Sequence, residues 1–233
     1  MGQHSGIGVL DKAMGVLHAA AQGPCSLADL CAVTGLPRAT AHRLAVGLET
    51  HRMLARDQDG QWRPGPALAE LAHTAEDPVV EASAAVLPRL REATGESVQV
   101  YRVDGTRRVC VAAVEPPTGL RDTVLVGSRL PLTAGSGAKV LLAWADPALQ
   151  RAVLADAAFG ERALADVRRR GWAQSVAERE PGVASVAAPI RGRDGRVVAA
   201  ISVSGPVDRM GRRPGVRWAA DLLTAAADVE KRM

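Results

Sequence analysis

The sequence has few aromatic residues, little lysine, three cysteines and no long apolar run. Aromatic residues make up 3% of its 233 residues, and its lysines are Lys12, Lys139 and Lys231. The other basic residues that carry fixed charge are arginine, which together with abundant alanine and glycine is typical of proteins from GC-rich genomes. The formal net charge of +4 is compatible with a polyanionic partner, but the arginine bias has this simpler explanation.

The cysteines and the apolar pattern exclude several classes of protein. Cys25, Cys31 and Cys110 are odd in number and not closely paired, so no disulfide framework is expected. They also lack the paired spacing of a zinc site, and no metal or other cofactor is expected. The N-terminus has no basic-then-apolar leader pattern, and no apolar run approaches the ~20 residues of a membrane span. We therefore expect a soluble, cytoplasmic protein.

The first part of the chain has the pattern of three short helices. Residues 8–22 place apolar side chains on one side of a helix, and a Gly-Pro pair follows them. Ser26 is a suitable N-cap for a second helix over 27–34, and Pro37 suits the first turn of a third helix that runs to about residue 51. Two helices joined by a three-residue turn predict a helix-turn-helix.

A small hairpin is predicted directly after the third helix. Asp59-Gly60 favours a tight turn between two short extended runs. Trp62, in the second run, is interpreted as a hydrophobic anchor of the hairpin. A hairpin in this place is a wing, so residues 1–66 are predicted to form a winged helix-turn-helix domain.

The rest of the chain alternates between helical and extended patterns. Residues 67–78 are predicted to form a linker helix, broken at Asp77-Pro78, and residues 79–233 a second domain. Extended runs flank Asp104-Gly105 and Asp194-Gly195, which are hairpin signals. A further extended run covers 123–132, and helices are expected over about 79–94, 135–156, 161–171 and from 214 to the end. This order predicts an α+β fold with an antiparallel sheet flanked by helices.

Specific sequence segments in both parts of the chain resemble those of a known protein family. In the first domain they are GVLDKAMGVL and SLADLCAVTGLPRATAHRLAVGLE, and in the second LPLTAGSGAKVLLAW, GWAQSVAEREPGVASVAAPI and VVAAISVSGP. They resemble the IclR family of bacterial transcriptional regulators, and the N-terminal wording is similar to an actinobacterial subgroup linked to leucine biosynthesis and nitrogen-dependent growth. The resemblance implies a winged helix-turn-helix DNA-binding domain, a GAF-like effector-binding domain, and homodimers or dimers of dimers.

The outer face of the third helix is the candidate DNA-reading surface. A helix in the major groove contacts base edges with outer residues near its N-terminus. Arginine, threonine and histidine can bond bases or phosphates there, small residues let the backbone approach, and a serine at a helix N-terminus suits a phosphate. The candidates are Ser26, Arg38, Ala39, Thr40, His42 and Arg43, with Arg56, Gln61 and Arg63 on the wing. The alternative is that these are solvated surface residues.

The charge of the first domain indicates how it would bind DNA. Through residue 66 there are six Lys and Arg residues against five Asp and Glu residues, so the excess is only one positive charge. Neutralisation of phosphates drives most non-specific binding, so one copy should bind weakly and two copies are needed. Two-fold symmetry of the protein then predicts a pseudo-palindromic operator in double-stranded promoter DNA.

Serines in the second domain are the candidate lining of a small-molecule pocket. Ser202 and Ser204 are two apart on a predicted strand and share one face, and Ser185 lies on the neighbouring strand across a hairpin. Ser136 and Gly137 lie in a glycine-rich turn before a helix, where free N–H groups suit a carboxylate. Small polar groups that converge on an apolar wall are typical of a pocket for a small acid.

The family resemblance extends this set of candidates. It implies an effector site at Ser136, Gly137, Ser175, Val183, Ser185, Ser202 and Ser204. It also implies a small organic acid as effector, and an amino acid or its keto-acid precursor fits this subgroup. The chain departs from the family at Gly137-Ala138-Lys139, where members often have Ala-Gly-Lys or Leu-Gly-Lys. The alternative is that the strand serines merely bond neighbouring backbone.

A catalytic alternative is a GAF-type enzyme that acts on a small carboxylate. The sequence has no Gly-x-Ser-x-Gly motif, and its histidines all precede the second domain. A Ser-His or Cys-His nucleophile within that domain is therefore excluded, and no catalytic residue is assigned. Cys110 is interpreted as core filling, with a redox role left open, and Glu178 and Glu180 as solvated loop residues.

These observations together favour a one-component transcriptional regulator that responds to a small metabolite. Its targets are expected to be amino-acid biosynthesis genes such as those for leucine, as the subgroup resemblance implies. A plain architectural DNA-binding protein is the remaining alternative, and it would protect no discrete site in a footprint.

Overall fold

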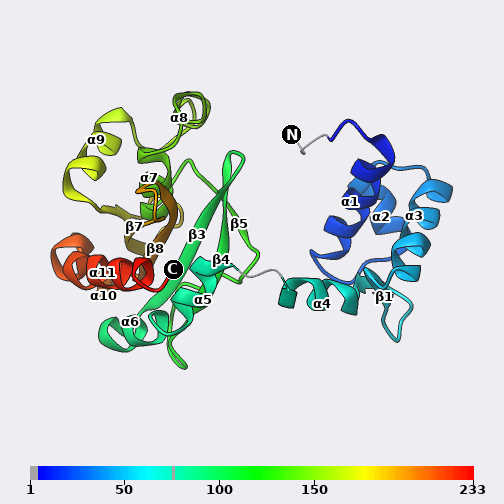
Figure 1. Ribbon diagram of the computed structural model, residues 1–233, viewed down its shortest axis with the longest axis horizontal. Coiled ribbons are helices and arrows are strands. Elements are labelled where there is room, and N and C mark those ends of the chain that lie inside the picture. The colour runs from blue at the N-terminus through cyan, green and yellow to red at the C-terminus, as the bar shows by residue number, and fades with distance from the viewer. Residues whose placement is uncertain (1–4, 75–76) are drawn as a thin grey trace. The chain divides into compact units, whose positions relative to one another are not determined.

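The computed structural model describes residues 5–74 and 77–233 (Figure 1). The chain forms two compact units, one up to residue 76 and one from residue 77 onward. The first unit has one hydrophobic core and the second has two. Among the described helices, none combines the length and the apolar character that a bilayer span requires.

The first unit is a helix-turn-helix with a wing. Its elements are α1 (Gly8–Ala20), α2 (Leu27–Thr34), α3 (Arg38–Thr50), β1 (Leu54–Arg56), β2 (Trp62–Pro64) and α4 (Pro66–Thr74). The helices and the antiparallel β1–β2 hairpin share one core, in which Leu30, Ala45 and Leu54 are buried. Trp62 is 2% exposed and anchors the wing in this core, as the sequence predicts. The predicted winged helix-turn-helix is confirmed.

Local sequence signals explain where these helices begin and end. Ser26 caps α2: its Oγ accepts the Asp29 N–H, and the Asp29 carboxylate accepts the Ser26 N–H at 2.9 Å. Gly35 ends α2 with a φ of 69°, a left-handed conformation that costs glycine little. Pro37 is the N-cap of α3, one position earlier than expected. α1 ends at Ala20, two residues before the predicted end.

The second unit is built around a six-stranded antiparallel sheet with the order β5-β4-β3-β8-β7-β6. The strands are β3 (Ser97–Asp104), β4 (Arg107–Val114), β5 (Arg129–Pro131), β6 (Ala173–Val176), β7 (Val183–Arg191) and β8 (Val197–Pro206). The hairpins β3–β4 and β7–β8 turn at Asp104-Gly105 and Asp194-Gly195, where the sequence predicts them.

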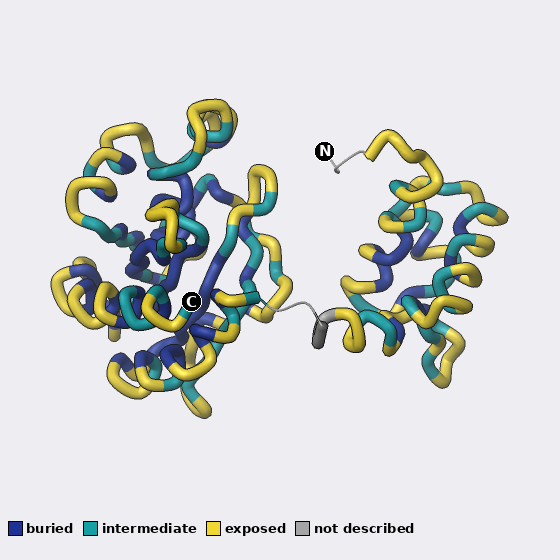
Figure 2. The backbone as a smooth tube through the Cα atoms, in the orientation of Figure 1, coloured by how far each residue is buried: buried dark blue, intermediate teal, exposed yellow. Residues whose placement is uncertain are grey.

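Helices cover both faces of this sheet, and Figure 2 shows buried strands between helices whose outer sides are exposed. On one face lie α5 (Pro78–Ala84), α6 (Leu87–Thr94) and α11 (Pro214–Glu230), and the short α10 (Val207–Met210) follows β8. On the other face lie α7 (Ser136–Ala143), α8 (Pro147–Leu154) and α9 (Glu161–Arg170). The predicted α+β class, with an antiparallel sheet flanked by helices, is confirmed.

Two helices predicted as continuous are each divided in two. The pattern over 79–94 forms α5 and α6, because Pro88 in the first turn of α6 has no N–H to donate to the carbonyl of Ala84. The pattern over 135–156 forms α7 and α8, because Asp146 caps a new helix that begins at Pro147. The Asp146 carboxylate accepts the first free N–H groups of α8 at 2.9 Å.

The strand predictions differ from the structure in two places. The expected extended run over 123–132 contains only the three-residue strand β5. β6 is absent from the predictions, although it pairs with β7 along its whole length. Four residues carry too little periodicity to be recognised before the partner strand is known.

The segment between the units was predicted to be a helix over 67–78. It corresponds to α4, which ends at Thr74, and residues 75 and 76 lie outside the described part of the chain. Asp77 then caps α5, since its Oδ1 accepts the N–H of Val79 at 3.0 Å. The predicted break at Asp77-Pro78 thus coincides with the start of a helix.

Candidate functional site

The outward side of α3 carries the candidate DNA-contacting residues. Ala41 and Ala45, on its inner side, are fully buried and hold the helix against the core. Among the described residues, no acidic side chain forms an ion pair with Arg38 or Arg43 on this face. An external anion therefore has no protein carboxylate to compete with for these guanidinium groups. Along the outer side, all exposed except a half-buried threonine, lie Arg38, Ala39, Thr40, His42 and Arg43.

The wing holds its polar side chains in different ways. The Arg56 guanidinium carbon lies 3.9 Å from the centroid of the Trp62 ring, and its Nε lies 3.5 Å from Oε1 of Glu49. Gln61 is half-buried, whereas Arg63 is exposed. Arg63 is therefore the wing residue best placed to reach a phosphate, because Arg56 would first have to leave Trp62 and Glu49.

The prediction that Ser26 binds a phosphate is not favoured by the structure. Its Oγ donates to Oδ2 of Asp29 at 2.7 Å and accepts the N–H of the same residue. The hydrogen bonds from Ser26 lower the pKa of Asp29, so a carboxylate already occupies this helix N-terminus. A phosphate there would meet a like charge, and the capping role accounts for Ser26.

In the second unit, four serines form a row across the sheet. The strand register pairs Ser97 with Ser204, Ser204 with Ser185, and Ser185 with Ser175, one from each of β3, β8, β7 and β6. Directly paired residues project from the same face. Ser202, two residues from Ser204, adds a hydroxyl to that face, which is the one that α7 covers.

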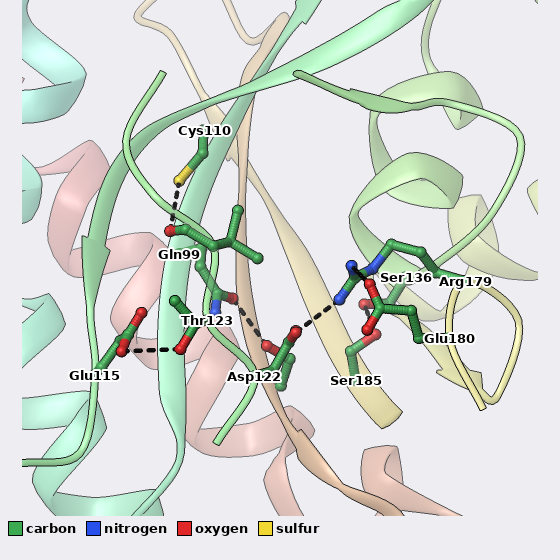
Figure 3. Close-up of polar contacts among 11 residues, drawn as sticks. Gln99, Cys110, Glu115, Asp122, Thr123, Ser136, Arg179, Glu180 and Ser185 are labelled. Carbon is green, nitrogen blue, oxygen red and sulfur yellow. Dashed lines mark hydrogen bonds and ion pairs between the residues drawn. The ribbon is translucent and has the colours of Figure 1, made fainter. Parts of the chain in front are cut away.

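The start of α7 closes over this serine row. Ser136 Oγ donates to Ser185 Oγ at 2.7 Å (Figure 3). Gly135 has a φ of 97°, and a Cβ added to Gly137 would lie 3.3 Å from the Tyr101 ring. Glycine at both positions therefore lets the backbone before and within the first turn of α7 approach the sheet closely.

A small cavity lies between the serine row and the start of α7. Its volume is about 20 Å³, which leaves room for about one water molecule. An organic ligand would therefore need the lining to move apart. The lining includes all seven predicted positions: Ser136, Gly137, Ser175, Val183, Ser185, Ser202 and Ser204.

Six residues that the sequence does not assign to the pocket, five of them charged or aromatic, complete this lining. Arg108 was available in principle, because it is two residues before Cys110 on an alternating strand and so shares its face. Asp122 lies in the loop between β4 and β5, where no periodic pattern indicates direction. The additional lining residues are Tyr101, Arg108, Asp122, Gly135, Arg179 and Glu180.

Arg108 is a buried cation that has carbonyl partners and no ion-pair partner among the described residues. It is 3% exposed, and its Nη1 donates to the carbonyl oxygens of Pro131 at 2.6 Å and Ala134 at 2.8 Å. Its guanidinium carbon lies 5.2 Å from the centroid of the Tyr101 ring. Burial lowers the pKa of Arg108 to about 10, so it remains a cation at neutral pH.

Arg179 joins the two acidic residues of the lining. Its Nη2 lies 2.7 Å from Oδ1 of Asp122, and its Nη1 contacts Oε1 of Glu180 (Figure 3). Burial opposes the charge, but the attraction and hydrogen bond of Asp122 together with the attraction of Glu180 outweigh it and raise the pKa of Arg179. Asp122 is only 7% exposed, so this ion pair compensates its desolvated charge.

Lys139 and Glu178 form hydrogen bonds that hold the start of α7 in place. Lys139 Nζ donates to the carbonyl oxygen of Gln174 at 3.0 Å and also contacts the Glu178 carboxylate. The second oxygen of that carboxylate accepts the Gly135 N–H at 3.2 Å. Glu178 is therefore part of the packed structure, and its interpretation as a solvated loop residue is wrong.

Among the residues that the structure describes, no histidine lines this cavity. In the described ranges, no group of three or more His, Cys, Asp or Glu side chains could hold a metal ion. Cys110 is fully buried, its Sγ lies 3.9 Å from the carbonyl oxygen of Val124, and it does not line the cavity. Burial raises its pKa to about 11, so the thiol stays protonated.

Comparison with solved structures places this fold among known proteins. An IclR transcriptional regulator from Alicyclobacillus acidocaldarius superposes with a TM-score of 0.85 at 24% identity, covering 97% of this chain and 98% of that one. An IclR homolog from Microbacterium hydrocarbonoxydans, crystallised with 4-hydroxybenzoate, also gives 0.85 at 24% identity, covering 96% and 98%. At these identities the similarity concerns the fold.

Sequence comparison identifies the family. The chain is 31% identical over 222 residues to the HTH-type transcriptional regulator BhcR of Paracoccus denitrificans, covering 88% of this chain and 80% of that protein. It is 30% identical over 237 residues to the glycerol operon regulatory protein of Streptomyces griseus, covering 94% and 92%. The IclR helix-turn-helix domain matches residues 9–58, and the bacterial transcriptional regulator IclR C-terminal domain matches residues 72–231. The chain belongs to the IclR family and is a DNA-binding transcriptional regulator.

Proposed function

We propose that this regulator binds a pseudo-palindromic operator as a homodimer or dimer of dimers, and that a small organic acid or amino-acid-like effector changes this binding. The observation that carries the proposal is the pairing, in separate units of one chain, of an exposed basic helix face with a hydroxyl-lined cavity. Regulation through such a pair requires that the effector bind two arrangements of the protein with different affinity.

The DNA contacts are proposed for α3 and the wing. Arg38 and Arg43 lie at exposed positions of the first turns of α3, where arginine can bond guanine or phosphate. His42 and Thr40 lie between them, and Ala39 is small enough to let the helix approach the groove. Arg63 extends the contact from the wing, with Gln61 and Arg56 beside it.

The effector site is proposed for the cavity under α7. Seven lining positions that the sequence suggests meet there, and the Ser136–Ser185 hydrogen bond supports the proposal because it brings hydroxyls from two elements together. Because the cavity has room for only about one water molecule, binding must displace its walls, and Arg179 with its two carboxylates forms one of them. That displacement is a route by which binding could alter the rest of the unit.

The regulated genes and the absence of enzymatic activity are also proposals. The relatives are regulators, and their names include a glycerol operon, so control of leucine biosynthesis stays a prediction from the N-terminal wording. We propose that the protein is not an enzyme, because the cavity pairs serines with no histidine. Incubation with small carboxylates should give no product, and turnover would favour the GAF-type enzyme.

Substitution of Arg43 tests the DNA-binding surface. We expect Arg43→Ala to weaken binding to the DNA upstream of the gene by about tenfold or more at fixed salt, because a lost base or phosphate contact costs ~1–3 kcal/mol. Lys12→Ala is the matched control, since it removes one positive charge from an exposed position of α1 in the same unit. Fluorescence anisotropy measures both. Equal affinities of the two variants would remove Arg43 from the contacts.

A further inference from the structure

Helix α3 ends on an arginine in a conformation that favours glycine. Arg52 has a φ of 58°, in the left-handed region, which is unfavourable for a residue with a Cβ. The Arg52 N–H donates to the Glu49 carbonyl oxygen at 2.8 Å, and the Met53 N–H donates to that of Leu48 at 2.9 Å, which is the pattern of a Schellman motif. By contrast, α2, α6 and α9 each end on a left-handed glycine. An arginine at this position therefore needs a reason other than helix termination.

The contacts of Arg52 to α4 supply this reason. Its carbonyl oxygen accepts the N–H of Ala67, the second residue of α4, at 3.0 Å, and its Nη2 forms an ion pair with Oε1 of Glu70. The Gly65 N–H, just before α4, donates to the Met53 carbonyl oxygen at 2.8 Å. A Cβ on Gly65 would collide with the Arg52 carbonyl group, so glycine permits this close approach. The start of α4 is thus attached to the end of α3 through both backbone and side chain.

We propose that Arg52 is a positioning residue that fixes the direction of α4 relative to α3, and that this junction sets the half-site spacing that a paired regulator recognises. The inference rests on the proposed function and deepens it, because it gives a residue outside the DNA-contacting set a role in paired binding. The chain leaves the DNA-reading unit through α4, so the freedom of α4 limits where the α3 of a second copy can lie. Backbone strain that surrounding contacts maintain is typical of positions with a functional task.

The exposure of the ion pair distinguishes positioning from stabilisation. The side chains of Arg52 and Glu70 are 59% and 56% exposed, and an ion pair at this exposure contributes little to stability. It can still bias the direction of a helix whose first turn is already held by backbone hydrogen bonds. The alternative role for Arg52 is direct contact with a DNA phosphate, for which it would have to leave Glu70. The two roles predict different results for the same variants.

The test compares operator affinity at two half-site spacings. A footprint first locates the half-sites in the duplex upstream of the gene. The full-length protein is then titrated by anisotropy with that duplex and with a version that has two extra base pairs between the half-sites. The insertion turns one half-site relative to the other by roughly 70°, and we expect it to weaken binding by the parent protein about tenfold or more. The ratio of the two affinities is the spacing discrimination.

Arg52→Gly removes the side chain while preserving the backbone. Glycine adopts a φ of 58° readily, so this variant should melt at the same temperature as the parent protein or higher. We expect its spacing discrimination to fall about threefold, which is the scale on which a surface ion pair shifts an equilibrium. Glu70→Gln should give the same fall, and exchange of the two residues, Arg52→Glu with Glu70→Arg, should restore part of the discrimination. Unchanged discrimination in both single variants would overturn the inference.

A control and the pattern of affinities separate the possible outcomes. Asp11→Asn is the charge-matched control for Glu70→Gln, since it removes one negative charge from α1 and retains the oxygen that accepts the Ser5 N–H. Direct phosphate binding by Arg52 would instead make Arg52→Gly weaken both duplexes equally and leave Glu70→Gln like the parent protein, which would also overturn the positioning role.

The behaviour of the parent protein separates this inference from the proposed function. A parent protein that does not prefer the upstream duplex, or that tolerates both spacings equally, would contradict paired operator binding itself. A parent protein that prefers the upstream duplex and its natural spacing, with a discrimination that neither variant alters, would contradict only the role of Arg52.

Discussion

At the scale of single residues, Arg108 and Cys110 show that the partners of a buried group determine its ionisation. Arg108 and Cys110 lie two residues apart on β4 and face the same side, yet at neutral pH Arg108 is charged whereas Cys110 is neutral. Arg108 is held by two carbonyl oxygens, which stabilise the cation, whereas the Cys110 thiol has only weak carbonyl contacts. The buried cation and the buried neutral thiol are thus distinguished by their partners.

The cysteines give a residue-scale prediction. Cys110 should resist alkylation in the native protein between pH 7 and 9, because only the thiolate reacts and a pKa of about 11 keeps that form rare below pH 9. Burial also raises the pKa of Cys25, so half-buried Cys31 should be labelled first. Mass spectrometry after timed iodoacetamide treatment measures this, with denatured protein as control. Labelling of Cys110 as fast as Cys31 would contradict its inert role.

Ser26 gives a second prediction at this scale. Ser26→Ala removes the cap of α2 and should cost ~1 kcal/mol of the stability of the first unit, whereas Ser26→Gly should cost only a few tenths. Operator affinity should fall little, since Asp29 already excludes a phosphate there. Chemical denaturation and anisotropy measure the two quantities. A large loss of affinity without a loss of stability would restore Ser26 as a phosphate contact.

At the scale of elements, hydrophobic periodicity predicts the long strands and helices. Turn residues, prolines and helix caps determine where the other elements begin and end. The hairpins at Asp104-Gly105 and Asp194-Gly195 follow from alternation and turn chemistry. Pro88 and Asp146-Pro147 divide two predicted helices in the same way that Asp77-Pro78 ends the linker segment, so both divisions were predictable. β6 was not, because its four residues gain their meaning from pairing with β7.

The candidate site shows the same limit. The alternation of Ser202 and Ser204, and the hairpin that brings Ser185 beside them, place those hydroxyls from sequence. Asp122 lies in the loop between β4 and β5, and Arg179 lies in the loop between β6 and β7. Only the folded chain brings their side chains within 2.7 Å of each other. The parts of the site that lie on regular elements could be predicted, and the parts that lie on loops could not.

The wing gives an element-scale prediction. Trp62→Ala should destabilise the first unit by ~3–5 kcal/mol, because it removes a fully buried aromatic side chain and the surface on which Arg56 lies. Operator binding should be lost while the second unit keeps its fold. Trp144→Ala, at a half-buried site of the second unit, is the control. Unaltered melting of the first unit in the Trp62 variant would show that Trp62 is not its anchor.

At the scale of the whole molecule, the two units differ in the kind of candidate site that each one carries. The first exposes a helix whose basic groups have no internal acidic partner among the described residues, and the second holds a small polar cavity. With an excess of only one positive charge through residue 66, a single first unit has little non-specific attraction for DNA. We therefore propose that sequence-specific binding depends on paired copies and on base contacts.

The most direct test of this account is the affinity of the purified full-length protein for the duplex upstream of its own gene, compared with a shuffled duplex of equal composition. Anisotropy titrations across a salt series should show at least ~1,000-fold tighter binding to the upstream duplex, and affinity that falls steeply with salt. Equal binding to both duplexes, with and without small carboxylates, would contradict the account.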